Sequence, residues 1–529
     1  MAGTGYDFSR LFNSSILAFS PGSTFLATAY QSRVIVRSTS NLSIVRTYQC
    51  LSASQSAGPS RASEELSVEQ LLWSSDGRYL LSYGRGNAWV FGLAVAGDGE
   101  GGEMVRIGGG VEGLIKVEWA KGGHEVLAWS EHGLRLTIYN LEMGEVGIIQ
   151  YPKSPETDKQ AHTWSPDGRY LSVVERHSGR DHLGIYDSFD SFSLLRHFPL
   201  HEDTHLLSWS PCGRYIATAD NHLHYAAHIY SPLGPCLTHF TPASASFGMN
   251  NEDPGLGIRI MAWALGGRFL ALGGWDGRVR VLDNDGWGCV AVMQWGNKTS
   301  ESGTVWREPA SWIQDTRGRG IIQFDRLSIP APLQSIRPDL SKSHPKMGIT
   351  HLSFNSDSSL LLIRKEDQPC VIHIHTFLPS PGAVPNVTHL TSISFSPIVR
   401  NVSWAPKGKR LAVVTRTGGV YIWDGESGWV DGEKSGEEEK GGLMEGIGIP
   451  SLTPFVAHDI HWAPDGQSLV VQDTDHFCLL YDDESDEKEK DESVTVEKWE
   501  EGLTVVCEEE EFSGVEMSDW NSRLQLEVM

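Results

Sequence analysis

The chain has 529 residues, of which 40% are apolar and 18 are Trp, so it is able to bury an extended core. Its formal net charge of −24 is concentrated in two segments, because residues 482–520 carry a net −14 and residues 425–440 carry a net −4. The net −6 left for the rest of the chain describes a nearly balanced body, which argues against general binding to nucleic acid.

No run of the sequence approaches the ~18 consecutive apolar residues that a membrane span requires. The first ten residues lack the apolar core of a secretory signal. The seven cysteines are scattered and none forms a C-x-x-C pair, so neither a disulfide framework nor a zinc site is expected. These features together predict an intracellular protein in a reducing compartment.

An aromatic residue, a small residue, a turn and an apolar strand recur along the chain, most clearly in Trp164-Ser-Pro-Asp-Gly-Arg-Tyr-Leu171. The nine aromatic positions are Phe19, Trp73, Trp119, Trp164, Trp209, Trp263, Phe354, Trp404 and Trp462. They are separated by 54, 46, 45, 45, 54, 91, 50 and 58 residues. A base period near 45 with insertions is typical of a four-stranded blade, so we predict an all-β, WD40-type β-propeller with nine blade-like repeats.

Each part of the repeat has a structural task. The aromatic residue is expected to end the first strand of its blade and to fill the space between neighbouring blades. The turn that follows requires a residue that tolerates a positive φ, which Asp-Gly or Lys-Gly supplies. Trp423-Asp424, at the end of a predicted third strand, is the dipeptide that names WD repeats.

The spacing of the repeats divides the chain into four parts. Residues 1–283 hold blades one to six, and residues 347–483 hold blades seven to nine with an acidic loop at 425–447. Residues 284–346 form a partly disordered insertion, in which 304–306 or 321–324 are candidates to complete blade six. Residues 484–529 are an acidic tail whose run 503–507 is a candidate closing strand. One large ring is favoured, while six-plus-three and seven-plus-two arrangements stay open.

Motifs for chemistry are absent from the sequence or stand in the wrong context. His201-Glu-Asp-Thr-His205 has the letters of a zinc-protease motif, but it directly precedes a predicted strand, whereas that chemistry needs a helix. The G-x-G-x-x-G matches at 97–102 and 108–113 are likewise followed by a strand rather than a helix. The pairs His222/His224 and His373/His375 are interpreted as ordinary strand surface. We therefore expect no enzyme, no catalytic residue, no cofactor, no metal and no small-molecule substrate.

Two charged loops are predicted to lie on one face of the disc, because both join the second and third strands of a blade. One contains Glu175, Arg176, Arg180 and Asp181, and the other contains Arg364, Lys365, Glu366 and Asp367. Mixed charge suits a peptide or protein partner, since such groups give specificity and a fast association rate. These eight residues are the candidate partner-binding positions.

Several segments outside the generic repeat resemble the spindle-pole and centrosomal WD-repeat family. They are Phe8-Ser-Arg-Leu-Phe-Asn-Ser-Ser15, Tyr151-Pro-Lys153, Asp167-Gly-Arg-Tyr-Leu-Ser-Val-Val-Glu-Arg176, Leu194-Leu-Arg-His-Phe198, His344-Pro-Lys-Met-Gly-Ile349 and Asp475-His-Phe-Cys478. The acidic loop and the tail lie outside the resemblance.

The resemblance implies a non-catalytic adaptor at the spindle pole body or centrosome, within the cytoplasm and cytoskeleton. It implies a role in anchoring microtubule minus ends and in maintaining the bipolar spindle. Its partners would be a coiled-coil spindle-pole anchoring protein and, in fungi, a minus-end-directed kinesin. An adaptor subunit of another assembly, such as one in translation initiation, is the alternative, although an RNA-facing module should show a basic stripe. Neither nucleic acid nor membrane is an expected partner.

Overall fold

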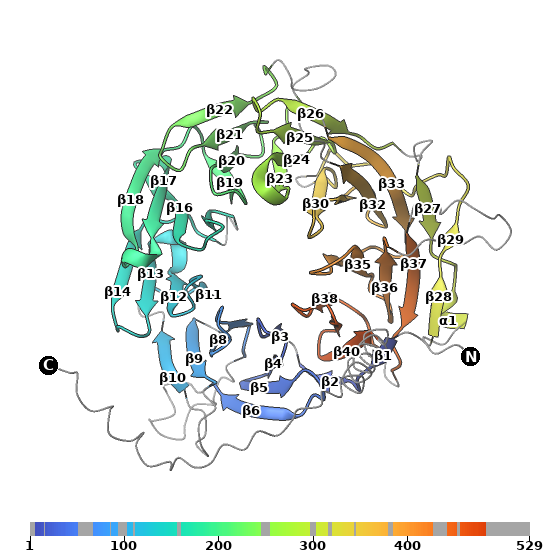
Figure 1. Cartoon of the computed structure of the whole chain (residues 1–529), viewed down its shortest axis with the longest axis horizontal. Coiled ribbons are helices and arrows are strands. Elements are labelled where there is room, and N and C mark those ends of the chain that lie inside the picture. Colours follow the sequence, from blue (N-terminus) through green and yellow to red (C-terminus); the bar gives the residue numbers. More distant parts are fainter. Residues whose placement is uncertain are drawn as a thin grey trace, which may run out of the picture. The chain divides into compact units, whose positions relative to one another are not determined.

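The computed structural model describes residues 6–482, apart from 15, 51–66, 85, 94–102, 109–111, 156–159, 245–253, 297–302, 316–319, 343–344, 379–384, 427–441 and 452–454. The strands of this part of the chain form nine sheets that follow one another around a single ring (Figure 1). The predicted all-β, nine-bladed propeller is confirmed, and the six-plus-three and seven-plus-two arrangements are wrong.

Blades one to six each contain four antiparallel strands in chain order. Blade one has β3 (Ile16–Phe19), β4 (Phe25–Tyr30), β5 (Arg33–Ser38) and β6 (Ile44–Gln49). Blade two has β7 (Gln70–Trp73), β8 (Tyr79–Gly84), β9 (Asn87–Gly92) and β10 (Glu103–Gly108). Blade three has β11 (Lys116–Trp119), β12 (Glu125–Trp129), β13 (Arg135–Asn140) and β14 (Val146–Gln150).

The next three blades continue this pattern. Blade four has β15 (His162–Trp164), β16 (Tyr170–His177), β17 (Arg180–Asp187) and β18 (Ser193–Pro199). Blade five has β19 (Thr204–Trp209), β20 (Ile216–Asp220), β21 (Ala227–Tyr230) and β22 (Cys236–Phe240). Blade six has β23 (Ile258–Trp263), β24 (Phe269–Gly274), β25 (Val279–Asp283) and β26 (Cys289–Met293). Short 3₁₀ turns occur at Glu131–Gly133, Ser188–Asp190 and Leu265–Gly267.

Blades seven and eight carry extra strands from the insertion. Blade seven has β30 (Ile349–Phe354), β31 (Leu360–Lys365), β32 (Val371–Leu378) and β33 (Asn386–Ser394), and β27 (Thr304–Arg307) pairs parallel with β33. The strand β29 (Asp325–Arg326) then pairs with β27. Blade eight has β34 (Asn401–Trp404), β35 (Arg410–Val414), β36 (Gly419–Asp424) and β37 (Leu443–Gly448), with β28 (Gly320–Gln323) on its outer edge.

The insertion therefore differs from the expectation in detail. Blade six is completed by β26, at residues 289–293, and neither 304–306 nor 321–324 belongs to that blade. The segment 304–306 extends blade seven and 321–323 extends blade eight. Hydrogen bonding between strands distant in sequence determines this placement, so the apolar pattern of each segment does not predict which blade it joins.

The ring is closed by the N-terminal segment. Blade nine has β38 (Asp459–Trp462), β39 (Ser468–Gln472) and β40 (His476–Asp482), and its outer strand is β1 (Tyr6–Phe8). The strand β2 (Phe12–Asn13) also pairs with β40, and the Phe12 and Phe477 rings stack with centroids 5.6 Å apart. The candidate closing run 503–507 lies outside the described residues, and β1 occupies the outer position that it was expected to fill.

The nine repeat aromatics occupy equivalent positions, because each is the last residue of the first strand of its blade. Four of the tryptophans donate their indole N–H to a carbonyl in the preceding blade. These hydrogen bonds are Trp73 to Ala18 (2.9 Å), Trp119 to Leu72 (3.0 Å), Trp404 to Ser353 (3.4 Å) and Trp462 to Ser403 (3.1 Å). In each case the acceptor immediately precedes the preceding blade's aromatic residue, so the repeat motif joins neighbouring blades.

The turn after the aromatic also has one geometry in all nine blades. Four residues after the aromatic, seven blades place a glycine with φ between +69° and +82°, as at Gly168. The weaker copies place Ser23 (φ +58°) and Ser358 (φ +57°) there instead. Both serine hydroxyls accept a backbone N–H from a neighbouring blade, from Asp465 and Leu265 respectively. A hydrogen bond between blades thus accompanies the less favourable backbone conformation.

The apolar core is divided into clusters that lie between adjacent blades. Between blades three and four, for example, Trp129 and Leu136 pack with Leu171 and Val173. The insertion is anchored by Glu308, whose carboxylate accepts hydrogen bonds from Trp312 (2.6 Å) in α1 (Trp312–Asp315), from Tyr421 (2.6 Å) and from the Ser396 N–H (2.7 Å). Among the described residues, no helix has the length and apolar character needed to cross a membrane.

Candidate partner-binding surface

The two charged loops lie on the same face of the ring, as their place in the repeat predicts. In blade four the predicted loop is only the turn between β16 and β17, because its four candidate residues lie at the ends of those two strands. In blade seven, Arg364 and Lys365 end β31, and Glu366 and Asp367 lie in the connection to β32. Successive strands of a blade run antiparallel, so these connections emerge at the same end of the sheets as the segments that lead from one blade to the next. The surroundings of the two loops differ sharply.

In blade four, the Asp181 carboxylate is completely buried and is surrounded by donors. The Lys153 ammonium lies 2.7 Å from it, the Arg176 guanidinium lies 3.1 Å from it, and the Thr204 N–H donates to it at 2.9 Å. Lys153 precedes β15 and Thr204 begins β19, so the Asp181 carboxylate connects blade four to the segment before it and to the first strand of blade five. A buried carboxylate is stable only with such partners, so Asp181 organises the loop rather than meeting a partner directly.

Glu175 has a comparable role beside it. Its buried carboxylate accepts a hydrogen bond from Tyr186 (2.5 Å) and lies 2.8 Å from Nε2 of His177 and 3.3 Å from Nε2 of His197. Burial, together with the Glu175 carboxylate, raises the pKa of Tyr186, so the phenol stays protonated and donates. The two histidines are about one-third exposed, so this second cluster reaches the surface through its imidazoles.

What blade four presents to solvent is a mixed surface of charge and aromatic rings. Arg176, with 44% of its side chain exposed, pairs at 3.1 Å with Asp203, which is 51% exposed. Arg180 is exposed at the turn itself, and the half-exposed Tyr151 lies edge-on to His177 with ring centroids 5.9 Å apart. We call Tyr151, Arg176, His177, Arg180 and Asp203 the blade-four surface.

The loop in blade seven is occupied by contacts within the protein. Arg364 donates to the carbonyls of Val399 (2.5 Å) and Arg400 (3.2 Å), in the connection to blade eight. Lys365 is buried and pairs with Asp367 at 3.0 Å.

The rest of this loop is held by blade six and the insertion. Glu366 pairs with Arg259 of blade six, whose guanidinium lies 4.2 Å from the Trp275 ring centroid. The carbonyl of Asp367 accepts the Ile336 N–H of the insertion at 2.7 Å. These four residues therefore join blades and hold the insertion, so they offer little to a partner.

The segment His201–His205 does not form the helix that a zinc protease needs. His201 precedes β19, and His205 lies within that strand. Burial lowers the pKa of His205 to about 4, with a smaller contribution from His222, whose ring centroid is 4.5 Å away. Of the glycine-rich segments, 97–102 lies outside the described residues, and the described end of 108–113 leads into β11, a strand.

The segments that carry the family resemblance meet in three places in the structure. Residues 8–15 and 475–478 pair at the ring closure, where Ser14 donates its N–H to the Asp475 carbonyl. The described part of 344–349 lies against the blade-seven loop, since Arg259 donates to the Met347 carbonyl at 2.7 Å and pairs with Glu366. The three remaining segments converge on blade four through Lys153, Arg176 and His197.

Comparison with known proteins gives one informative match. The chain is 28% identical to the WD repeat-containing protein WRAP73 of Mus musculus over 499 residues, which cover 90% of this chain and 96% of the mouse protein. The similarity to this WD-repeat protein therefore extends over almost the whole length of both chains. The match confirms the family resemblance seen in residues 8 to 478, and WD40 propellers of this kind are typically non-catalytic.

Further comparisons add little about the chain. The chain matches no protein-family model. The crystal structure of the C-terminal WD40 domain of Sif2 is 11% identical, with 89% of this chain and 97% of that chain covered and a TM-score of 0.45. The Cps50 (Swd1) β-propeller of Myceliophteria thermophila is 12% identical, with 90% and 99% covered and a TM-score of 0.36.

Four residues around these loops were not among the predicted partner-binding residues: Lys153, His177, His197 and Asp203. Lys153 and His197 lie within the family-like segments, so that signal was present in the sequence, but nothing in one sequence joined those segments to the 175–181 loop. Asp203 lies two residues after His201, in the connection that the failed zinc-protease motif marked as a loop.

Proposed function

We propose that the chain is a non-catalytic protein-interaction scaffold at microtubule-organising centres, the spindle pole body or centrosome. It helps to anchor microtubule minus ends and to maintain the bipolar spindle, as the resemblance implies. The observation that carries this proposal is the match to WRAP73 across 96% of that protein, combined with family-like segments that meet on blade four.

The partner assigned to the blade-four surface is a coiled-coil spindle-pole anchoring protein. A coiled coil presents charged side chains of both signs beside its apolar seam. Arg180 and the Arg176–Asp203 pair offer complementary charge, and Tyr151 offers an exposed aromatic ring with a polar tip. A minus-end-directed kinesin is the second partner that the resemblance suggests, and it would join through the assembled complex.

The proposal is tested by imaging a tagged chain in dividing cells and identifying the proteins that co-purify with it. We expect a signal at the spindle poles and recovery of a coiled-coil protein. An Arg180→Glu variant should lose both, because it reverses an exposed charge on the blade-four surface. Lys407→Glu makes the same charge change at an exposed turn between first and second strands, on the opposite face, and should retain both. Recovery of translation factors without a spindle-pole signal would contradict the proposal.

A further inference from the structure

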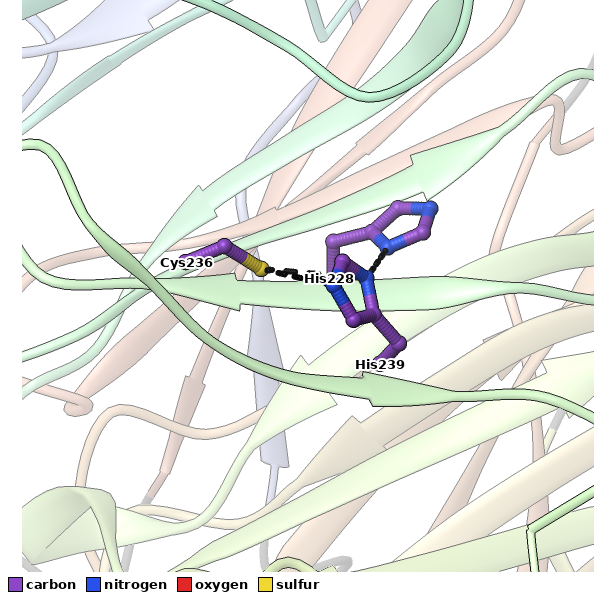
Figure 2. A group of neighbouring side chains, drawn as sticks. All are labelled: His228, Cys236 and His239. Carbon is purple, nitrogen blue, oxygen red and sulfur yellow. Dashed lines mark hydrogen bonds between the residues drawn. The ribbon is translucent and has the colours of Figure 1, made fainter.

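Three metal-ligating side chains converge on the outer edge of blade five. His228 on β21 lies directly opposite His239 on the outer strand β22, and Cys236 begins that strand. One ligand atom from each residue lies within 4.8 Å of the others (Figure 2). His228 is buried, Cys236 is half-buried and His239 is exposed, so the group is reachable from solvent on one side.

A β-bulge makes this convergence possible. Residues three apart in a regular strand face opposite sides of the sheet. Here Thr238 pairs with Ile229 while Cys236 pairs with Tyr230, so Leu237 is an extra residue without a partner in the register. The bulge brings Cys236 to the same side as His239, and the Cys236 sulfur lies 3.7 Å from Nε2 and 3.8 Å from Nδ1 of His239.

The tautomer of His228 is favoured by a buried carboxylate. Oδ1 of Asp220 lies 3.0 Å from Nε2 of His228, and both side chains are only 3% exposed. The negative charge beside Nε2 favours the proton on that nitrogen, and Nδ1 of His228 faces Nδ1 of His239. In metal sites a carboxylate that accepts this N–H orients the histidine, and a small rotation of Asp220 or His228 would complete that hydrogen bond.

We propose that His228, Cys236 and His239 form a binding site for a transition-metal ion, with zinc the best fit. One thiolate and two imidazoles are the ligand types that zinc prefers, and tetrahedral coordination sets sulfur and nitrogen ligands about 3.6 Å apart. The distances from sulfur to the His239 nitrogens already match this spacing. The two Nδ1 atoms are 2.6 Å apart and would separate to about 3.3 Å around a bound ion.

His201 is the neighbouring candidate for a fourth ligand. Its ring centroid lies 4.9 Å from those of both His228 and His239, and it belongs to the connection between blades four and five. An ion held by all four residues would fasten the edge strand β22 to that connection.

Cobalt substitution of the purified full-length chain tests the site, because a thiolate bound to Co²⁺ gives a near-ultraviolet charge-transfer band. We expect about one equivalent of Co²⁺ to produce the band and Zn²⁺ to displace it. Cys236→Ser should abolish the band, whereas Cys212→Ser, in the same blade but outside the group, should retain it. Asp220→Asn should keep the band and weaken binding by ~10–100-fold, as expected of a positioning residue.

His239→Ala changes an exposed side chain and should remove high-affinity binding without unfolding the blade, as thermal melting would verify. His224→Ala, at an exposed histidine of the same blade outside the group, is the matched control and should bind normally. Absence of the band in the folded wild type, or its persistence in Cys236→Ser, would overturn the proposal. The result is independent of the spindle-pole experiment, since it measures the purified chain alone.

Discussion

The charged loops of blades four and seven have similar compositions and equivalent places in the fold, yet their charged side chains differ in exposure and in partners. In blade four, the charges that need burial are paired beneath the surface, and Arg176, Arg180 and Asp203 stay open to solvent. In blade seven, Arg364 and Lys365 are taken up by backbone carbonyls and by Asp367. Charge in a loop is therefore available to a partner only where no other element of the protein uses it.

The insertion accounts for the difference between the surroundings of the two loops. Residues 304–307 and 320–326 add strands to blades seven and eight, and Ile336 bonds to the blade-seven loop itself. In blade four, the neighbouring connections contribute Lys153 and Thr204, which satisfy Asp181 but leave the turn uncovered. In blade four, we therefore expect the buried charges to stabilise the fold and the exposed charges to be available to a partner. In blade seven, we expect the loop charges to stabilise the fold only.

Loss of packing between blades four and five should have the largest effect. Trp209 is buried, and its ring stacks on Tyr170 of blade four with centroids 6.4 Å apart. Trp209→Ala should lower the free energy of unfolding by ~3–5 kcal/mol, because a large cavity is left in the core. Chemical denaturation of the wild type and the variant measures this difference. A decrease in the free energy of unfolding below ~1 kcal/mol would show that the contact between blades four and five does not depend on the repeat aromatic.

Removal of the buried carboxylate should cost nearly as much. Asp181→Ala leaves Lys153, only 11% exposed, without its 2.7 Å partner, and should destabilise the protein by ~3 kcal/mol. Asp203→Ala, which removes an exposed partner of Arg176, should cost less than ~1 kcal/mol. Equal decreases in the free energy of unfolding of the two variants, measured by denaturation, would mean that the buried and exposed carboxylates of blade four contribute equally to stability.

Acidification should destabilise blades five and seven through buried histidines. Burial lowers the pKa of His205 in blade five and of His351 in blade seven to about 4, below the unfolded value near 6.5. Their neutral forms therefore favour folding above pH ~6.5, and this stability is lost as the pH falls toward 4.

Each histidine should contribute about 1.4 kcal/mol per pH unit within this window. Unfolding midpoints measured from pH 7 to 5 should fall. His205→Gln and His351→Gln should each flatten the decline, and an unchanged slope in both would contradict the assignment.

The smallest expected change in stability comes from replacing one arginine in each loop, which compares the two loops directly. Arg364→Ala removes two hydrogen bonds from a charged donor to carbonyls and should cost ~1.5 kcal/mol. Arg180→Ala changes an exposed side chain and should stay within ~0.5 kcal/mol. Thermal melts of both variants give the comparison, and a larger cost for Arg180→Ala would reverse the roles assigned to the loops.

The sequence predicted the parts of the fold that repeat. Nine aromatics in phase are enough to specify the blades, because each occupies the same strand end and the same contact with its neighbour. The insertion was not placed correctly, since the pairing of β27 with β33 joins residues 304–307 to residues 391–394 and has no local signal. Ring closure by β1 was likewise invisible, because a three-residue strand carries no periodicity.

The candidate sites were predicted only in part. The sequence identified Arg180 and Asp181 but could not tell an exposed charge from a buried one, because burial depends on which connections lie nearby. The Cys236-x-x-His239 spacing was present, yet a regular strand would separate the two side chains, and only the bulge at Leu237 brings them together.

The central claim is that a partner binds through the blade-four surface, and co-purification with matched charge reversals tests it most directly. The amount of coiled-coil partner recovered from dividing cells should fall at least about tenfold for Arg180→Glu, equivalent to ~1.4 kcal/mol of binding free energy. It should be unchanged for Lys407→Glu, with both variants folded and equally abundant. Undiminished recovery with Arg180→Glu, or an equal loss with Lys407→Glu, would contradict the account.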